Sequence, residues 1–134
     1  MSLTQEERNI MVQLEIERAE RMLTEFPIYI ENNLWNTLVN RMYYAVFHAA
    51  TALLISKGLH AGTHQGVFIL LSQHFIKEGI LSTEEGRLFS RLETLREKGD
   101  YNCFIDPEAE EVLPLIEPAK AFVAHISALI ANKT

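Results

Sequence analysis

Arg41, Tyr44 and His48 are the residues of this chain whose types and spacing most clearly suggest chemistry. They stand three and then four positions apart, so one face of a helix would present all three. An arginine there could hold a phosphate, and a histidine could move protons near neutral pH. The same side chains could instead be core residues with satisfied polar tips, because aromatic residues in helices usually serve packing. Spacing alone leaves both interpretations open.

A second candidate cluster is Arg96, Asp100 and Tyr101. Arg96 and Asp100 are i, i+4 neighbours and could simply pair on a helix surface, an interaction of about 0.3–0.5 kcal/mol. The same stretch carries further basic residues: Arg87, Arg91 and Lys98. Their concentration in a chain of net charge −6 favours an edge that binds anions.

The histidines His60, His64 and His74 are a weaker candidate for a metal site. A zinc site needs three or four convergent ligands, and the sequence has neither a cysteine pair nor a His-Glu-x-x-His motif. Cys103 is the single cysteine and lacks the local signature of a nucleophile. We therefore expect no metal and no other cofactor.

The first cluster lies in an apolar stretch that predicts a buried central helix. From Met42 to Ile55, His48 and Thr51 are the clearly polar residues besides the tyrosine hydroxyls. Such a stretch covers about 21 Å, too short for a bilayer core of roughly 30 Å. We expect the helix to begin near residues 31–33 and to end at Gly58, a typical residue after a helix C-terminus. Three residues should be fully buried in it: Ala49, Ala50 and Leu53.

Four further helices are predicted from capping residues and apolar periodicity. Thr4 and Glu7 form a capping box that begins the first helix, which Pro27 should end after Phe26. Its expected inward positions are Ile10, Met11, Leu14, Met22, Leu23 and Phe26. A third helix should cover residues 63–77, and Ser82 should begin a fourth with a second capping box. The last should begin at Asp106-Pro107 and be broken early by Pro114 and Pro118.

Composition places the chain among ordinary globular proteins. It has 134 residues, 48% of them hydrophobic and 22% charged, and it shows neither strand alternation nor a secretory signal. We expect one domain, residues 1–134, folded as an all-α, antiparallel up-and-down bundle of four main helices plus a shorter one. The net charge argues against sequence-blind adhesion to DNA or to anionic membranes. A cytoplasmic location is the plain inference.

An ordered series of landmarks resembles a known family. These are Asn40 to Ala50 (NRMYYAVFHAA), Ala52-Leu53-Leu54, Lys57-Gly58, Thr63-His64-Gln65-Gly66, Phe75 to Gly79, and Leu95-Arg96 followed by Asp100-Tyr101. Together they are similar to small bacterial and archaeal proteins of the HEPN superfamily, the higher eukaryotes and prokaryotes nucleotide-binding domain. The resemblance runs from about Ala19 to Ile130.

The resemblance implies a four- to five-helix bundle, often a homodimer and often encoded beside a minimal nucleotidyltransferase in toxin–antitoxin-like pairs. Many members are metal-independent endoribonucleases whose arginine holds the scissile phosphate, while a histidine assists attack by the 2′-hydroxyl. Arg41 and His48 would be the catalytic pair here. On the later helix where the family motif usually lies, the chain offers Arg96 and Asp100-Tyr101 without a histidine.

The leading hypothesis is a HEPN-like protein of a toxin–antitoxin-like or defence module that binds RNA or a nucleotide. Its expected ligand-binding residues are Arg41, Tyr44, His48, Arg96, Asp100 and Tyr101. Arg41 and Asp100 should pair in one cleft, within one subunit or across the two-fold axis of a dimer, which would leave Arg96 free for a phosphate. A second hypothesis is a non-catalytic module that docks a nucleotidyltransferase or itself. A third is a metal-dependent helical enzyme that uses the three histidines.

Overall fold

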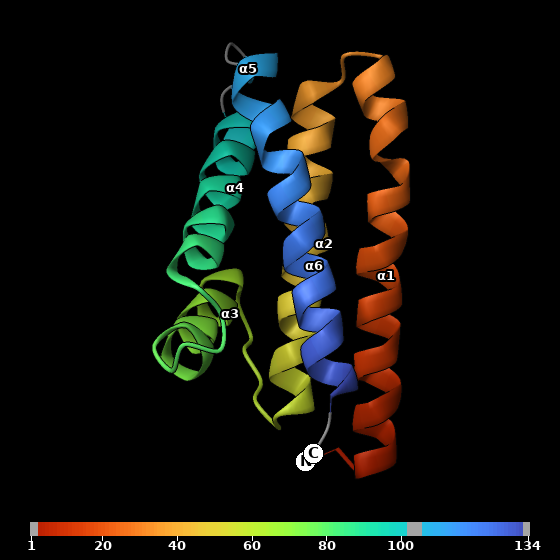
Figure 1. Cartoon of the computed structure of the whole chain (residues 1–134), viewed down its shortest axis with the longest axis vertical. Helices are drawn as coiled ribbons and strands as arrows, with labels where there is room; N and C mark the ends of the chain where they lie inside the picture. Colours follow the sequence, from red (N-terminus) through yellow and green to blue (C-terminus); the bar gives the residue numbers. More distant parts are fainter. Residues whose placement is uncertain (1–2, 102–105, 133–134) are drawn as a thin grey trace.

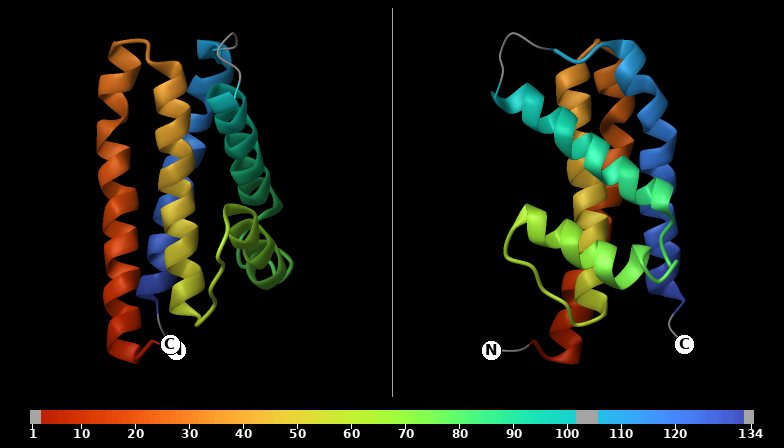
Figure 2. Two further views of the ribbon diagram at one scale, coloured as in Figure 1. Left: turned by 180° about the vertical axis from the view of Figure 1, so that it is seen from behind. Right: turned by 90° about the vertical axis from the view of Figure 1, so that its left-hand side faces the viewer.

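The computed structural model describes residues 3–101 and 106–132, except for the side chain of Tyr101, and it contains no strand within these ranges. The helices are α1 (Gln5–Glu31), α2 (Trp35–Ser56), α3 (His64–Leu71), α4 (Thr83–Tyr101), α5 (Ala109–Val112) and α6 (Ile116–Ala131). Four long helices, α1, α2, α4 and α6, run alternately up and down (Figures 1 and 2). The short helix α3 lies across one side of the bundle, and α5 is a single turn that precedes α6. The predicted all-α bundle of four main helices plus a shorter one is confirmed.

Helix α2 is the centre of the bundle and contacts all five other α-helices. Ala49 and Ala50 are completely buried, and Leu53 is 1% exposed, as predicted. Because alanine side chains are small, the neighbouring helices can pack close to the α2 backbone while Leu53 fills the space between them. The apolar stretch from Met42 to Ile55 therefore forms the core of the fold.

Both predicted capping boxes are present. The Thr4 hydroxyl accepts a hydrogen bond from the Glu7 amide, and the Glu7 carboxylate accepts one from the Thr4 amide. Ser82 and Glu85 make the same reciprocal pair before α4. Helix α2 ends where expected, since Gly58 has a φ of +74°, a left-handed conformation that favours glycine.

The prediction that Pro27 ends the first helix is wrong. Helix α1 continues through Pro27 for another turn to Glu31. A proline inside a helix removes one backbone hydrogen bond and costs about 3 kcal/mol. Apolar residues on both sides offset this cost, because Phe26 is fully buried and Tyr29 and Ile30 pack against the core. Tertiary burial therefore outweighs the local signal.

The inward face assigned to the first half of α1 is also partly wrong. Ile10 and Leu14 are 55% and 56% exposed, whereas Val12 and Ile16 are the buried residues of that segment. The two sets lie on different faces of one helix, and periodicity does not say which of two apolar faces meets the core. Helix α1 forms an edge of the bundle, which leaves its other face uncovered (Figures 1 and 2).

The later helices follow the prediction with local differences. Helix α3 continues as a π-helical turn, Ser72–Ile76, so the segment ends near Lys77 as expected. A 3₁₀ turn, Leu113–Leu115, interrupts the last helical segment at Pro114. The start of that segment differs, because Glu108 caps α5 in a reciprocal pair with Glu111 and Asp106 does not.

By length and apolar composition alone, two helical stretches of the described residues could cross a membrane. They are Trp35–Ser56 and Ala109–Ala131, of which 67% and 28% respectively is buried within the molecule. The first is α2, and a mostly buried core helix passes the same test of length and composition. For α2, burial in the bundle accounts for the apolar sequence.

Candidate functional site

A layer of aromatic rings connects α2 with α3 and α4. Tyr43 is completely buried and packs edge-on against Tyr44, at 5.1 Å between ring centroids, and against Phe89 of α4 at 5.8 Å. Phe47 lies one turn further along α2 and contacts the ring of His64, the first residue of α3, at 4.4 Å. Residues of α2 thus form one wall of the layer, because side chains three or four positions apart share a helix face.

Arg96 of α4 extends over this layer. Its guanidinium carbon lies 4.7 Å from the centroid of the Tyr43 ring and 5.9 Å from that of Tyr44. The side chain is 12% exposed. A cation over an aromatic face at this range is stabilised by about 0.5–2 kcal/mol, and more strongly as water is excluded. The arrangement keeps a permanent positive charge at the edge of the core.

The donors of Arg96 are incompletely satisfied by the described residues. Nη1 donates to Oδ2 of Asp100 at 3.0 Å, and Nη2 lies 4.0 Å from Oε1 of Glu97, beyond hydrogen-bond range. Nε is buried without an acceptor in the described part of the chain. Asp100 and Glu97 are more exposed to water than Arg96. Water around the two carboxylates therefore weakens their attraction for the guanidinium. The guanidinium therefore retains capacity for a further anion.

The close approach of α4 to α2 depends on Gly99. A Cβ atom at this position would lie 1.9 Å from Oδ1 of Asn36, at the start of α2. The absence of a side chain lets the last turns of α4, with Arg96 and Asp100, lie directly against α2.

His64 is joined to the same layer by a hydrogen bond of 3.1 Å between its Nδ1 and the Tyr43 hydroxyl. Thr63 caps α3 by accepting from the Gly66 amide at 2.9 Å, which fixes the position of His64 at the helix start. Burial raises the pKa of Tyr43 well above its usual range, and the carboxylate of Glu93 adds to the rise. Tyr43 therefore remains neutral, and its ring contacts both Arg96 and His64.

His48 lies on the other side of Tyr44 and pairs with α1. Its Nδ1 donates to Oε2 of Glu15 at 2.6 Å, and both side chains are mostly buried. The carboxylate fixes the orientation of the imidazole and favours a proton on Nδ1, which leaves Nε2 as the nitrogen able to exchange protons. The Tyr44 ring lies 6.3 Å from the His48 ring, so Tyr44 connects His48 with Arg96.

The structure brings together four of the six residues selected from the sequence: Tyr44, His48, Arg96 and Asp100. The side chain of Tyr101 lies outside the described residues. The expected pairing of Arg41 with Asp100 is not found within the subunit, because Asp100 pairs there with Arg96, its i, i+4 neighbour. Arg41 is half-buried and has no hydrogen bond or ion pair within residues 3–101 and 106–132. The pairing was expected because a fully buried arginine needs a counter-charge. Arg41 keeps contact with solvent, so it does not need one.

Sequence reasoning missed two carboxylates of this region and did not connect one histidine, His64, with the aromatic residues. Glu15 is separated from His48 by more than thirty residues, and no local spacing connects them. Glu93 was not singled out, although it lies near Tyr43. His64 was considered as a metal ligand, yet it belongs to the aromatic layer. In the described ranges, no three His, Cys, Asp or Glu side chains are placed to hold a metal ion, and His60 and His74 are exposed.

The remaining basic residues of α4 are less suited to a ligand. Arg87 pairs with Glu84, and Arg91 lies 3.4 Å from Glu111. Both arginines are largely exposed, so their ion pairs are weak and solvated. Among the arginines of α4, Arg96 is thus the one whose position best suits the binding of an anion.

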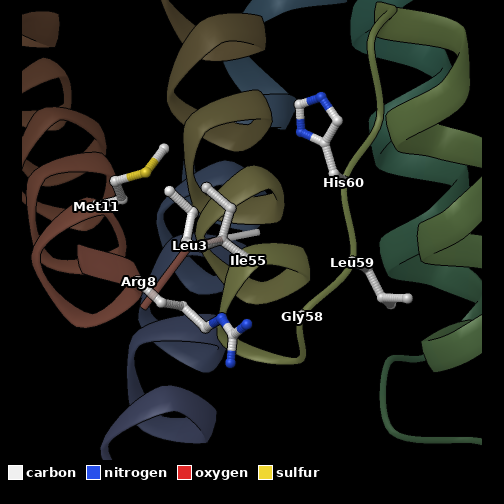
Figure 3. Close-up of a pocket in the computed structure, with 7 residues that line it drawn as sticks. All are labelled: Leu3, Arg8, Met11, Ile55, Gly58, Leu59 and His60. Carbon is white, nitrogen blue, oxygen red and sulfur yellow. The ribbon is translucent and has the colours of Figure 1, made fainter. Parts of the chain in front are cut away.

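Of the hollows on the described surface, one borders the aromatic layer at His64, and another lies apart from the layer at the start of α1. A cavity of about 420 Å³ lies between α3 and α4 and is lined by His64, Gln65, Phe68, Ser90, Glu93, Thr94 and Glu97. A largely apolar pocket of about 390 Å³ lies between the start of α1 and the end of α2; its lining residues are Leu3, Arg8, Met11, Ile55, Gly58, Leu59 and His60 (Figure 3). Arg8 reaches from α1 towards the turn at Gly58. The first cavity has the denser set of hydrogen-bonding groups and shares His64 with the layer.

A family model described as the HEPN domain matches residues 12–129. That range includes α2, α3 and α4 complete, and with them every residue of the aromatic layer and Arg96. The chain belongs to the HEPN family. This HEPN domain is 38% identical over 115 residues to a protein of Methanocaldococcus jannaschii named "putative toxin", covering 86% of this chain and 85% of the relative.

A UPF0332 protein of Thermotoga maritima is 34% identical over 115 residues, covering 86% of this chain and 87% of the relative. A second protein of Methanocaldococcus jannaschii with the name "putative toxin" is 26% identical over 118 residues, or 88% of this chain and 80% of its own length. Membership of the HEPN family and these names suggest a nucleotide-related or toxin-like role.

Proposed function

We propose that this HEPN domain binds single-stranded RNA through Arg96 and acts as the toxin-like component of a toxin–antitoxin or defence module. The observation that carries the proposal is the guanidinium of Arg96, held over Tyr43 and Tyr44 with only one hydrogen bond of normal length to the described residues. Arginine is suited to phosphate because its planar donors can bind two oxygens at once.

The surroundings of Arg96 favour RNA over a free inorganic anion. Tyr44 is half-buried at the edge of the aromatic layer and can stack with an unpaired base, an interaction of about 1–3 kcal/mol. Arg41 stands one turn before Tyr44 and is, like it, half-buried, so its exposed part can contact a neighbouring phosphate. The net charge of −6 limits binding that rests on overall attraction alone, so affinity must come from this local site.

If the domain also cleaves RNA, the chemistry is transfer of the phosphate to the 2′-oxygen without a metal. An imidazole takes the proton of the 2′-hydroxyl and the bond between the 2′-oxygen and phosphorus forms. The bond from phosphorus to the 5′-oxygen breaks as that oxygen takes the proton from the imidazolium. His48, oriented by Glu15, would be the imidazole, and Arg41 and Arg96 would stabilise charge on the phosphate.

The test is the affinity of labelled single-stranded RNA for the protein in EDTA, measured by fluorescence anisotropy at fixed salt. Arg96→Ala should weaken binding at least about tenfold, because a hydrogen bond to a charged group contributes about 1.5–3 kcal/mol. Arg87→Ala is the matched control, since Arg87 lies on the same helix but is exposed. It should change affinity less than about twofold.

Circular dichroism of both arginine variants should show unchanged helix content. Equal loss of affinity in the two variants would indicate general charge attraction and contradict a site at Arg96. Incubating the wild-type protein with RNA in EDTA tests cleavage separately. His48→Ala should abolish any cleavage that is observed.

A second candidate function is self-association or docking of a nucleotidyltransferase without catalysis. The observation that favours it is the uncovered face of α1, where Ile10 and Leu14 are more than half exposed and Ile28 is 58% exposed. Ile10 and Leu14 are one turn apart, and Ile28 lies five turns along the same face from Ile10. A row of this kind suits a homodimer in which two copies of α1 pack together.

Light scattering of the purified protein should therefore give twice the 15.3 kDa mass of the chain at micromolar concentration. Leu14→Glu should reduce the mass to that of the monomer, because a charge in an apolar interface is costly. The matched control is Leu113→Glu, at an apolar position that is 44% exposed on another part of the molecule. A wild-type monomer would contradict self-association through α1, and RNA binding by Arg96 can be measured in either case.

A further inference from the structure

The cavity between α3 and α4 is connected to Arg96 through one lining residue, Glu97, whose carboxylate lies 4.0 Å from the guanidinium. Its composition is unlike that of a phosphate site. Two of its lining residues, Glu93 and Glu97, are carboxylates one turn apart on the same face of α4. Its opposite wall is the first turn of α3, with His64 and Gln65. Carboxylates repel phosphate oxygens, so a ligand that enters this cavity must present hydrogen-bond donors.

Glu93 is the most informative residue of the cavity. Its side chain is half-buried, and it makes no hydrogen bond or ion pair with any residue in the described ranges. Glu97, by contrast, is exposed and lies near Arg96. Withdrawing a carboxylate from water without supplying donors is unfavourable. A ligand that brought two N–H groups to Glu93 would remove this cost.

The rest of the cavity matches the outline of a nucleobase. Phe68 is half-buried, is supported by the Phe89 ring at 5.4 Å, and offers an apolar face for stacking. Ser90 and Thr94 are one turn apart on α4 and supply hydroxyls that can donate to a carbonyl oxygen. The volume of about 420 Å³ is within the range of roughly 300–1,000 Å³ typical of small-molecule sites.

We infer that this cavity is a guanine pocket, in which Glu93 accepts hydrogen bonds from N1–H and the N2 amino group of a base next to the phosphate held by Arg96. Among the four RNA bases, guanine alone has two adjacent donors on its pairing edge, which match the two oxygens of one carboxylate. Its O6 would accept from a hydroxyl of Ser90 or Thr94. The inference rests on the proposed RNA binding at Arg96.

The experiment uses labelled oligouridylates of one length in which a single central position is guanosine, inosine, adenosine or uridine. The wild-type protein should bind the guanosine RNA about tenfold more tightly than the adenosine and uridine RNAs, since a matched bidentate pair discriminates between bases. Inosine lacks only the N2 amino group, so its RNA should lose most of the preference. This comparison of RNAs uses only the wild-type protein, so its result cannot be explained by a variant that fails to fold.

Glu93→Gln should remove the preference and leave affinity for the uridine RNA within about twofold, because glutamine keeps one acceptor and adds a donor. Glu20→Gln, at an exposed position of α1, is the matched control and should keep the preference. A preference that survives Glu93→Gln would overturn the assignment of the pocket.

Equal affinity of the wild-type protein for all four RNAs, with binding still weakened by Arg96→Ala, would overturn the guanine pocket and leave the proposed function intact. Absence of RNA binding by the wild-type protein would overturn both. The two failures are therefore distinguishable.

Discussion

Replacing Tyr43 with alanine is expected to lower the free energy of unfolding by about 3–5 kcal/mol, the usual cost of removing a large buried ring. Tyr43 is completely buried and contacts Tyr44, Phe47, His64 and Phe89. The substitution removes their common packing partner and leaves a cavity beneath the guanidinium of Arg96. Urea unfolding followed by circular dichroism measures the change.

Tyr43→Phe is the matched control, because it keeps the ring and removes only the hydroxyl that bonds to His64. It should cost about 0.5–1.5 kcal/mol, the range for a single hydrogen bond. RNA affinity should also separate the two variants: Tyr43→Ala should weaken binding as Arg96 loses its support, and Tyr43→Phe should preserve it. Equal destabilisation by both variants would show that the ring contributes little and would contradict the aromatic layer as the support of the site.

Leu53→Ala is expected to cost about 2–5 kcal/mol through lost burial and the cavity that remains. Leu53 is 1% exposed in the central helix, and its neighbours on the same helix, Ala49 and Ala50, are too small to fill the vacated space. The bundle can therefore collapse only partly around the cavity.

Leu113→Ala is the corresponding surface control, at a leucine that is 44% exposed, and should change stability by less than about 0.5 kcal/mol. Chemical denaturation of both variants under the same conditions gives the comparison. A small effect of Leu53→Ala would mean that α2 does not form the core of the bundle in solution.

The sequence by itself determined where α1 and α4 begin and where α2 ends. Thr4 and Ser82 cap the helices that they were expected to cap, and Gly58 ends the central helix in a left-handed conformation. These features involve hydrogen bonds and backbone angles of residues within about four positions of one another, so they can be read locally. The burial of Ala49 and Leu53 could also be predicted, because a helix that is apolar on every side has to lie in the core.

Tertiary packing decided where α1 ends and which of its apolar faces is buried, because the local sequence signals for these features conflict. Pro27 predicts a helix end, but the buried side chain of Phe26 and the packing of Tyr29 and Ile30 keep α1 helical beyond it. Ile10 and Val12 are both apolar, and the sequence alone does not reveal that Val12 is buried while Ile10 faces outwards. The choice depends on how two whole helices pack, which involves many side chains at once.

The candidate site shows the same division. Helical spacing correctly grouped Tyr44 with His48, and Arg96 with Asp100, because those residues are neighbours on one helix. Only the tertiary structure placed Arg96 over Tyr43, joined His64 to the Tyr43 hydroxyl and paired Glu15 with His48. These contacts link residues more than twenty positions apart, and they form because α1, α3 and α4 all pack against α2. The sequence specifies the chemical groups, and the crossing of the helices decides which of them meet.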